Sequence, residues 1–486
     1  MPETAKNPSR KHLRILLGLL CLLISLLIVT GVYNVYKPLP ENISFAGEIH
    51  PVDEIAFYRD LTWVDNGGNR HFQQEIFDKI LSMIGSAEKF VLLDMFLFND
   101  FIGKGAPPYR NLAQEVTDAL VARKVQFPDL LVVVITDPIN TVYKGLTNRY
   151  FEKMQSADIH VVFTELERLR DSNPAYSAFW RLLLKPFGNG SGSLLPNPFG
   201  RGSVSLRSYL ALLNFKANHR KLIIADAADS YGSLITSANP HDGSSGHDNV
   251  AVYFNGPAVS DLLQSEQAVL DFSGGPALPD LPPQKTIQPQ TPITVRILTE
   301  RKIKDGLIAA LKKAGRGDKL SIAIFYFSDR DIVAELKGAA HRGAAVRVLL
   351  DPNKDAFGRK KNGIPNRQVA AELVRSGIPV RWSNTHGEQA HTKMLLAEYA
   401  QGQSVAILGS ANFTGRNLND LNLETDIAVF GPAGSALFRQ MGEYMDRQWS
   451  NRDGIRYSLD YSAYADTSLR RRLQYRWMEA TGMSTF

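Results

Sequence analysis

Apolar and polar positions follow one order that occurs twice along the chain. In the first half, helical and apolar runs alternate over residues 77–84, 90–98, 112–121 and 130–135. The second half repeats this order over 308–313, 320–327, 332–340 and 345–350. Apolar strands joined by a crossover helix are typical of βαβ units, and near-continuous apolar strands lie in sheets that are covered on both faces. The pattern therefore predicts an α/β fold with a mostly parallel sheet in each half.

The first segment of the chain has the pattern of a membrane anchor. Residues 15–36 carry no formal charge, and a helix of this length crosses about 30 Å of hydrocarbon. Basic residues precede the span, so the positive-inside rule predicts a cytoplasmic N-terminus and an extracytoplasmic body. A cleaved signal peptide is the alternative, but no small-x-small site follows the apolar run. We therefore predict a single-pass membrane protein with an uncleaved anchor.

Proline marks the join between the two halves. Six prolines lie within residues 276–292, a density that no helix or central strand tolerates, so we expect an extended linker. A second loop over 186–205 is rich in Gly, Ser and Pro, and a surface loop is favoured there over a contact with substrate or bilayer. The predicted organisation is a basic N-terminus over 1–14, an anchor over 15–36, a first half over 50–273, a linker over 274–292, a second half over 293–455 and a basic, aromatic tail over 456–486.

Composition narrows the class of protein. The 486 residues are 44% hydrophobic and 21% charged, which is typical of a globular chain of two or three domains and excludes a collagenous or low-complexity protein. The net charge of +6 is concentrated at the two ends, so the body lacks the broad basic surface that nucleic-acid binding usually needs. The one cysteine, Cys21, lies in the anchor, which excludes an intrachain disulfide and a four-cysteine metal site.

Two matching motifs carry the candidate chemistry. Each has a histidine, a lysine two residues later and an acid five residues after the lysine, and the members are His219, Lys221 and Asp226, then His391, Lys393 and Glu398. Each motif is followed by Ser-Ala-Asn, which supplies Ser237 and Asn239 in the first half, and Ser410 and Asn412 in the second. One match of this kind is weak, but two in equivalent places of a repeat point to a shared function.

The spacing within the motif has a geometric meaning. Residues i and i+2 of a strand face the same side, so each histidine projects together with its lysine. If the halves pack about a pseudo-twofold axis, two His, two Lys and two Asn converge on one pocket. Such a pocket suits phosphodiester cleavage without a metal, because one neutral histidine can attack phosphorus while the other, protonated, serves the leaving oxygen. The different protonation states of the two histidines predict a bell-shaped pH profile.

The doubled motif, its trailing Ser-x-Asn and the proline-rich join resemble the phospholipase D superfamily over about residues 55–450. The resemblance implies a duplicated fold of two α/β/α sandwich halves with pseudo-twofold symmetry. It implies His219 as the nucleophile and His391 as the general acid and base. It further implies phosphate binding by Lys221, Lys393, Asn239 and Asn412, with support from Asp226, Glu398, Glu424, Ser237 and Ser410.

The chain departs from the family pattern at three points. The second acid is Glu398 in place of Asp, and the spacing from His to Asn is longer than usual, which predicts a longer hairpin turn in both halves. The family's Asn-x-Glu is present only in the second half, where its carboxylate, Glu424, would orient a catalytic imidazole. Aligning residues 427–429 with 250–252 places His247 at the equivalent position of the first half, with Asp248 next to it. Either side chain could support a histidine there.

Two further clusters have competing interpretations. Residues 241–248 contain His and Asp, but a loop is favoured over a metal site because the segment fixes no ligand geometry. In the C-terminal tail, arginines and aromatic residues either bind anionic lipid headgroups or form a solvated helix face, and the cluster comprises Arg470, Arg471, Arg472, Tyr475, Arg476 and Trp477.

The anchor favours one substrate class, because an enzyme held at a bilayer meets lipids at high local concentration. The predicted function is a membrane-anchored phosphodiesterase that hydrolyses or transphosphatidylates phospholipid headgroups. One alternative is an extracytoplasmic, metal-independent nuclease, since the sequence Ser-Ala-Asn-Phe-Thr around Asn412 resembles that of nuclease members of the superfamily. Another alternative is a catalytically silent lipid-binding protein. The predicted partners are the phospholipid bilayer and a phosphodiester substrate, with phospholipid preferred over nucleic acid. No cofactor, metal or obligate protein partner is predicted.

Overall fold

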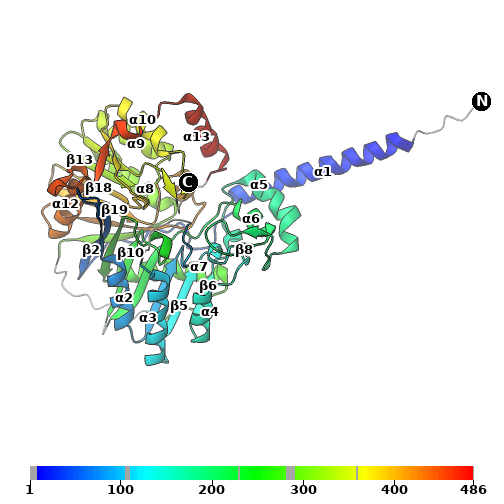
Figure 1. Ribbon diagram of the computed structural model, residues 1–486, viewed down its shortest axis with the longest axis horizontal. Helices are drawn as coiled ribbons and strands as arrows, with labels where there is room; N and C mark the ends of the chain where they lie inside the picture. Colours follow the sequence, from blue (N-terminus) through cyan, green and yellow to red (C-terminus); the bar gives the residue numbers. More distant parts are fainter. Residues whose placement is uncertain (1–7, 104–109, 228–229, 281–290, 357–358, 485) are drawn as a thin grey trace, which may run out of the picture.

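The computed structural model describes residues 8–103, 110–227, 230–280, 291–356, 359–484 and 486. Its first element is α1 (Pro8–Tyr36), which projects away from the body of the molecule (Figure 1). The stretch Lys11–Tyr36 is long and apolar enough to cross a membrane, and its most apolar window is not buried inside the protein, whereas Gly31 and Asn34 near its end are buried. The predicted span over 15–36 lies within this helix. Of the predicted basic N-terminus, residues 1–7 lie outside the described residues.

The first half is built on an eight-stranded sheet. Parallel pairing is confined to β4, β5 and β6, and the other neighbours pair antiparallel. In order across the sheet the strands are β3 (Arg70–Gln74), β2 (Ile55–Val64), β11 (Asn249–Asn255), β10 (Ser230–Thr236), β9 (Lys221–Ala227), β4 (Phe90–Met95), β5 (Leu131–Thr136) and β6 (His160–Phe163).

The second half is built on a nine-stranded sheet in which β13, β14 and β17 pair in parallel. In order the strands are β1 (His50–Pro51), β12 (Thr294–Thr299), β20 (Thr425–Pro432), β19 (Gln403–Gly409), β18 (Lys393–Glu398), β13 (Lys319–Ile324), β14 (Ala345–Leu350), β17 (Val380–Ser383) and β21 (Ser458–Asp460). The edge strands come from outside the predicted second half. β1 lies in the predicted first half and β21 in the predicted tail. Of the predicted linker, residues 281–290 lie outside the described residues.

Seven strands of one sheet match seven of the other in the same order, from β2 to β6 and from β12 to β17. The fold is therefore a duplicated α/β fold, as the sequence predicts. The expectation of mostly parallel sheets is wrong, because both sheets are mixed. Strands joined by a crossover helix are parallel, whereas the motif strands β9 and β18 each form a hairpin with the next strand and must run antiparallel to it.

Helices cover both faces of each sheet, which gives two α/β/α sandwiches. The outer helices are α2 (Ile76–Ser86), α3 (Leu112–Gln126) and α4 (Arg149–Ser156) in the first half, and α8 (Arg301–Lys313), α9 (Arg330–His341) and α10 (Asn366–Arg375) in the second. The inner faces carry α7 (Ala258–Ser273) and α12 (Ala436–Ser450). In α2 the buried positions Ile76, Ile80 and Ile84 recur every four residues, which is the apolar stripe that docks a helix on a sheet.

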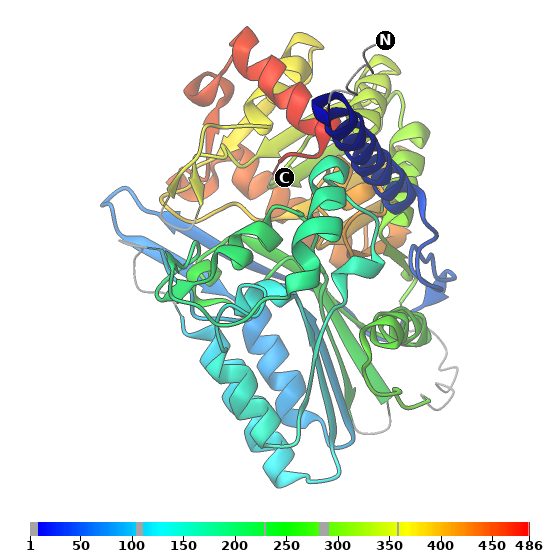
Figure 2. The same ribbon diagram turned by 90° about the vertical axis from the view of Figure 1, so that its right-hand side faces the viewer.

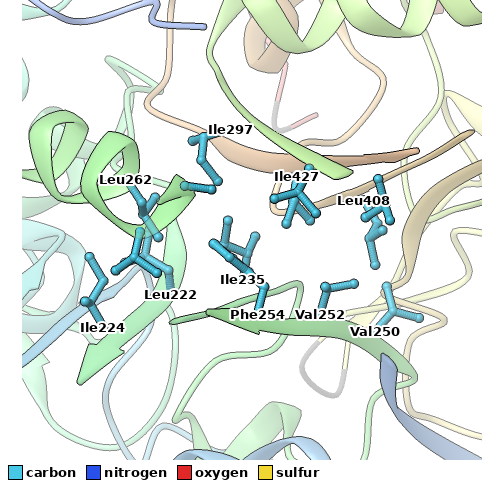
Figure 3. Close-up of a cluster of buried hydrophobic side chains, with 14 of the residues drawn as sticks. Leu222, Ile224, Ile235, Val250, Val252, Phe254, Leu262, Ile297, Leu408 and Ile427 are labelled. Atoms are coloured by element: carbon cyan, nitrogen blue, oxygen red, sulfur yellow. The ribbon is translucent and has the colours of Figure 1, made fainter. Parts of the chain in front are cut away.

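The inner faces of the two sheets meet in one hydrophobic core (Figure 3). Side chains alternate along each strand, so that in β9 Leu222 and Ile224 join this shared core while Ile223 joins the separate core under the outer helices. The labelled members are Leu222, Ile224, Ile235, Val250, Val252, Phe254, Leu262, Ile297, Leu408 and Ile427. Burial of each such side chain contributes about 1.5–3 kcal/mol. The shared core holds the two motif strands in a fixed relation.

An insert over residues 164–217 distinguishes the first half. It makes up most of the connection from β6 to β9 over residues 164–220, whereas only residues 384–392 join β17 to β18 in the second half. Its main elements are α5 (Pro174–Phe179), a π-helical turn (Trp180–Leu184), β7 (Leu195–Pro196), β8 (Ser203–Val204) and α6 (Leu206–Leu212). In both Figure 1 and Figure 2 the insert lies where α1 meets the body. There Asp171 N donates to Asn34 O at 3.0 Å.

Short elements complete the chain. A last helix, α13 (Leu469–Thr481), follows β21. The others are α11 (Gly415–Leu418), the hairpin β15 (Asp355–Ala356) and β16 (Arg359–Lys360), and 3-10 turns at Pro138–Thr141, Leu166–Arg168, Lys185–Phe187, Asp242–Ser244, Arg452–Gly454 and Tyr461–Tyr464.

Candidate active site

One cavity of about 600 Å³ takes side chains from both halves. His219 and Asn239 reach it from the first half, and His391 and Asn412 reach it from the second. The structure thus brings both motif histidines and both asparagines to a single pocket. The two lysines lie immediately behind it.

Backbone contacts between the halves bring the motifs to this pocket. Ahead of β9, His219 N donates to Leu423 O at 2.9 Å. Ahead of β18, His391 N donates to Asp248 O at 2.9 Å. Each motif therefore pairs with the segment that leads into β20 or β11 of the other half. This reciprocal exchange is what a pseudo-twofold arrangement requires.

Two buried aspartates hold the residue in front of each histidine, and sequence reasoning gave them no role. Asp137 Oδ2 accepts from Asn218 N at 2.8 Å, and Asp351 Oδ2 accepts from Ala390 N at 2.9 Å. Burial raises the pKa of both carboxyls to about 7. In the sequence, these aspartates are marked by an Asp-Pro pair that directly follows the equivalent strand in each half, β5 and β14.

His219 is held by a carboxylate of the other half. Its Nδ1 lies 2.8 Å from Glu424 Oε1, so the ring is oriented with Nδ1 toward Glu424 and Nε2 left for a substrate. Glu424 also accepts hydrogen bonds from Ser410 Oγ and Asn417 Nδ2. Burial lowers the pKa of His219 well below its usual value, and the nearby lysine ammonium groups lower it further. The imidazole is therefore neutral.

His391 is held by an amide instead. Its Nδ1 lies 3.2 Å from Asn249 Oδ1, which also accepts from Ser237 Oγ at 2.9 Å. Asn249 Nδ2 donates to His247 O at 3.1 Å, which fixes the amide with its oxygen toward the imidazole. Burial lowers the pKa of His391 well below its usual value, and the positive charge of Lys393 adds to this.

Strand register identifies Asn249 as the counterpart of Glu424. Val252 pairs with Ile235, and Ile427 pairs with Leu408 at the equivalent place of the second half. Asn249 lies three residues before Val252, and Glu424 lies three residues before Ile427, so the two occupy equivalent positions.

The alignment that put His247 opposite Glu424 is therefore wrong by two residues. The connection from Ser237 to Asn249 is two residues shorter than the one from Ser410 to Glu424, and a match of apolar residues alone does not reveal this. His247 instead packs beside His391, with ring centroids 5.8 Å apart, and Asp248 supplies the carbonyl that binds His391 N.

Lys221 and Lys393 are fully buried behind the histidines. Lys221 Nζ donates to His219 O at 2.6 Å, and Lys393 Nζ donates to His391 O at 2.7 Å. Burial lowers the pKa of Lys221 to about 7 and that of Lys393 well below its ordinary value. Two ammonium groups crowded into a buried site are stabilised by an anion, because its negative charge offsets both desolvation and mutual repulsion.

The acids that end the two motifs do not reach the pocket. Asp226 lies near the far end of β9 and accepts from the backbone N–H groups of Glu88, Lys89 and Phe90. Glu398 ends β18 and pairs with Lys319 at 3.2 Å. Five residues of strand separate each acid from its lysine, which is about 17 Å. The expected support of the site by Asp226 and Glu398 is replaced by a role in anchoring the strands.

The segment 241–248 is buried rather than an open loop. His241 Nδ1 lies 2.9 Å from Ser244 Oγ, and its Nε2 lies 2.8 Å from Phe101 O. Asp242 Oδ1 accepts from Ala113 N at 3.0 Å, at the start of α3. These polar groups are therefore used to fix the floor of the cavity and the helix beside it.

The cavity lining combines positive charge with an apolar wall. Among the lining residues that the structure describes, the formally charged ones are all basic, and they are Lys216, Lys360, Lys361 and Arg416. The apolar wall includes Pro198, Phe199, Leu212 and Phe215 from the insert, and Phe486. Pro198 and Phe199 belong to the predicted surface loop over 186–205, so this part of the loop lines the cavity. The lining suits a ligand that is anionic at one end and apolar at the other.

The pKa values of the buried groups predict how anion binding depends on pH. Below about pH 7 Lys221 is charged, and above it this charge is lost. Burial raises the pKa of Glu424 to about 7 and of Asp426 to about 8, so both gain negative charge over the same range. All three changes act in one direction. Sulfate, whose own charge is constant, should bind most tightly near pH 6 and more weakly at each step toward pH 9 by calorimetry. Affinity that stays constant or rises over that range would contradict the proposed anion site.

Comparison with known proteins gives a family-model match within the second half and a similar fold over most of the chain. Residues 307–449 match the family model described as cardiolipin synthase, PLD-like domain. A search of curated proteins found no match. The phosphatidylserine synthase of Haemophilus influenzae Rd KW20 is 11% identical, covers 93% of this chain and 97% of its own, and superposes with a TM-score of 0.55.

Two other solved structures are similar to parts of this chain. Polyphosphate kinase from Porphyromonas gingivalis is 12% identical and covers 88% of this chain and 53% of its own, with a TM-score of 0.44. Nuc from Salmonella typhimurium, a phospholipase D family member, is 19% identical and covers 35% of this chain and 98% of its own, with a TM-score of 0.27. The resemblance to the phospholipase D superfamily is confirmed.

Proposed function

We propose that this chain, which has a phospholipase D-like fold, is a membrane-anchored phosphodiesterase that acts on phospholipid headgroups through a phosphohistidine. One observation carries the proposal. Two neutral histidines from the two halves line a single cavity whose charged lining is basic and whose wall is partly apolar. The anchor α1 supports a lipid substrate, since it keeps the cavity near a bilayer.

In the first step, Nε2 of His219 attacks phosphorus. The N–P bond forms, the bond from phosphorus to the leaving oxygen breaks, and the leaving oxygen takes a proton from Nε2 of His391. His391 must be protonated to do this, and the bound phosphodiester raises its pKa because the anion favours the imidazolium. Lys221 and Lys393 stabilise the charge that gathers on the phosphoryl oxygens.

In the second step, water or an alcohol attacks the phosphohistidine. Neutral His391 takes the proton of the attacking hydroxyl, the new P–O bond forms, and the N–P bond breaks to return His219 to its neutral state. Water gives hydrolysis, and a lipid or headgroup alcohol gives transfer of the phosphatidyl group.

The unequal support of the two histidines favours His219 as the nucleophile. Attack through Nε2 leaves a positive charge on a ring that keeps its Nδ1 proton, and a buried carboxylate stabilises that charge more than an amide does. Glu424 supplies the carboxylate to His219 at 2.8 Å, whereas His391 has only the amide oxygen of Asn249. Asn239 and Asn412, which line the same cavity, are the proposed neutral donors to the phosphate oxygens.

The placement of the anchor leads to a proposed topology. Basic residues precede the apolar span over 15–36 within α1, so we place the N-terminus in the cytoplasm and the body on the other side of the membrane. The cavity would then act on lipids of the leaflet that faces the body.

The substrate class can be tested with the full chain in detergent or vesicles. We expect release of headgroup, or its exchange for an added alcohol, from phosphatidylglycerol or phosphatidylcholine vesicles in the presence of EDTA, and at least a 10³-fold loss in the His219→Ala and His391→Ala variants. Cleavage of single-stranded DNA with lipids untouched would favour the nuclease alternative. Vesicle binding without turnover of either substrate would leave a silent lipid-binding protein.

A further inference from the structure

The C-terminal helix α13 carries an apolar stripe on its outer face. Leu469, Leu473 and Trp477 are 67%, 61% and 54% exposed, and their spacing of four residues places them on one side of the helix. The opposite side is the one that packs on the body. There Tyr475 is buried and its hydroxyl donates to Ser328 O at 3.1 Å. The stripe therefore faces outward because the helix is fixed in this rotation.

Exposed arginines border the stripe. Arg470, Arg472 and Arg476 lie within one turn of it and are exposed, while Arg471 pairs with Asp466 at 2.8 Å. An apolar stripe between cationic side chains is the pattern of a helix that lies in the headgroup region of an anionic bilayer. A solvated helix face, the other interpretation of these arginines, does not account for three large apolar side chains held outward.

Direct contacts place α13 beside the exit of the anchor. Its last turn ends at Gly482, which has φ +70° and lies so close to the insert that a Cβ there would come within 1.6 Å of Ser172 O. The adjacent Asp171 donates through its N–H to Asn34 O in the last turns of α1, at 3.0 Å. Arg170 Nε donates to Lys37 O, just past that helix, at 2.9 Å. In Figure 1 α13 runs across the direction of α1, and Figure 2 shows the two helices close together.

The end of α13 also forms part of the cavity. Arg416, which lines the cavity, donates through Nη2 to Ser484 O at 2.5 Å and to Gly482 O at 3.1 Å. Phe486, the last residue, lies in the apolar wall. One short segment thus has its outer face beside the anchor and its end in the candidate active site.

We propose that α13 lies on the surface of the anionic leaflet from which α1 emerges, with its apolar stripe between the headgroups and its arginines against lipid phosphates. The helix is about 20 Å long, so a single leaflet patch next to the anchor accommodates it. Seated in this way, α13 holds the cavity mouth at the bilayer surface, where a phospholipid can enter without crossing water. The consequence for turnover rests on the proposed function, whereas the seating of the helix does not.

The seating is tested on the full chain in vesicles of phosphatidylglycerol and phosphatidylcholine. In a Cys21→Ser background, the Leu473→Cys variant is labelled with an environment-sensitive fluorophore, and quenching by nitroxide-labelled lipid is measured. The control is Val125→Cys, because Val125 is 72% exposed and lies near the end of α3, a helix that Figure 1 shows away from α1. We expect quenching at 473 to exceed that at 125 by at least about threefold. Equal quenching at the two positions would overturn the proposal.

A second experiment, which measures turnover, separates this proposal from the proposed function. The double variant Leu473→Glu, Trp477→Glu should turn over vesicle phospholipid about tenfold more slowly, because it loses the burial of two apolar side chains. Its turnover of a dissolved short-chain phospholipid should stay unchanged, and Gln474→Glu, an exposed residue off the stripe, should match the native protein on both. Full vesicle turnover by the double variant contradicts the proposal. Absence of turnover of either substrate by the native protein contradicts the proposed function, and the quenching result still decides the seating.

Discussion

Replacing His219 by alanine should lower kcat by about 10⁴-fold, because the variant has no nucleophile to form the covalent intermediate. His391→Ala should lose about 10³-fold on a phospholipid, whose alkoxide leaving group needs a proton. With a p-nitrophenyl phosphodiester the leaving group needs no proton, so His391→Ala should keep its first step while His219→Ala does not. The measurement is burst and steady-state release of p-nitrophenol beside headgroup release from vesicles.

The matched control for these variants is His160→Ala, an exposed histidine at the start of β6. It should leave both rates unchanged, and circular dichroism should confirm that all three variants are folded. A burst that survives in His219→Ala and disappears in His391→Ala would reverse the two roles. Equal loss of the burst in both would remove the distinction between them.

Exchanging the supports of the two histidines should have the next largest effect. Glu424→Gln keeps an oxygen toward Nδ1 of His219 but removes the negative charge, so we expect kcat to fall about 100-fold. Asn249→Asp places a carboxylate against His391 and should raise the pKa of that imidazole, since a negative neighbour favours the charged form. His391, which must donate a proton, would then stay protonated to higher pH, and the basic limb of the plot of kcat against pH should move to higher pH.

The pH dependence of kcat for the native protein and both variants tests this asymmetry. Glu424→Gln should lose rate at every pH, whereas Asn249→Asp should keep its maximal rate within about tenfold and shift its profile. Equal losses without any shift in Asn249→Asp would mean that the amide does not set the protonation of His391. A matched pair, Ser410→Ala and Ser237→Ala, removes one hydrogen bond from each support and should reproduce the same order of effects more weakly.

The sequence predicted the convergence of the motifs because convergence follows from repetition. Two copies of His-x-Lys on equivalent strands, with a shared core between the sheets, bring His219 and His391 to one cavity. The βαβ units were readable for the same reason, since strand, helix and strand succeed one another locally along the chain. The π-helical turn and other details of the insert had no counterpart in the second half to reveal them.

Features that depend on strand register or on long-range pairing could not be predicted from the sequence. The partner of His391 is Asn249 because β11 pairs with β10 in a register that differs by two residues from a match of apolar letters. The mixed sheets follow from hairpins at β9 and β18, whose direction is set by turns rather than by composition. The family resemblance places Asp226 and Glu398 at the site, but a strand of regular rise carries them to its opposite end.

The edges of the second sheet show the same limit. β1 and β21 join it from segments that precede and follow the predicted second half, and each is only two or three residues long. Such short strands are specified by the edge they meet rather than by their own pattern. The placement of Phe486 in the cavity wall likewise depends on the path of α13, which no local pattern predicts.

In the proposed mechanism, two histidines of different halves act in turn on one phosphorus atom. The most direct measurement is isolation of the covalent intermediate by rapid denaturation of His391→Ala during reaction with a phosphodiester that has a good leaving group, followed by peptide mapping. We predict close to one phosphoryl group per chain, attached to the ring nitrogen of His219. A phosphoryl group on another residue, or steady turnover without any covalent intermediate, would contradict the mechanism.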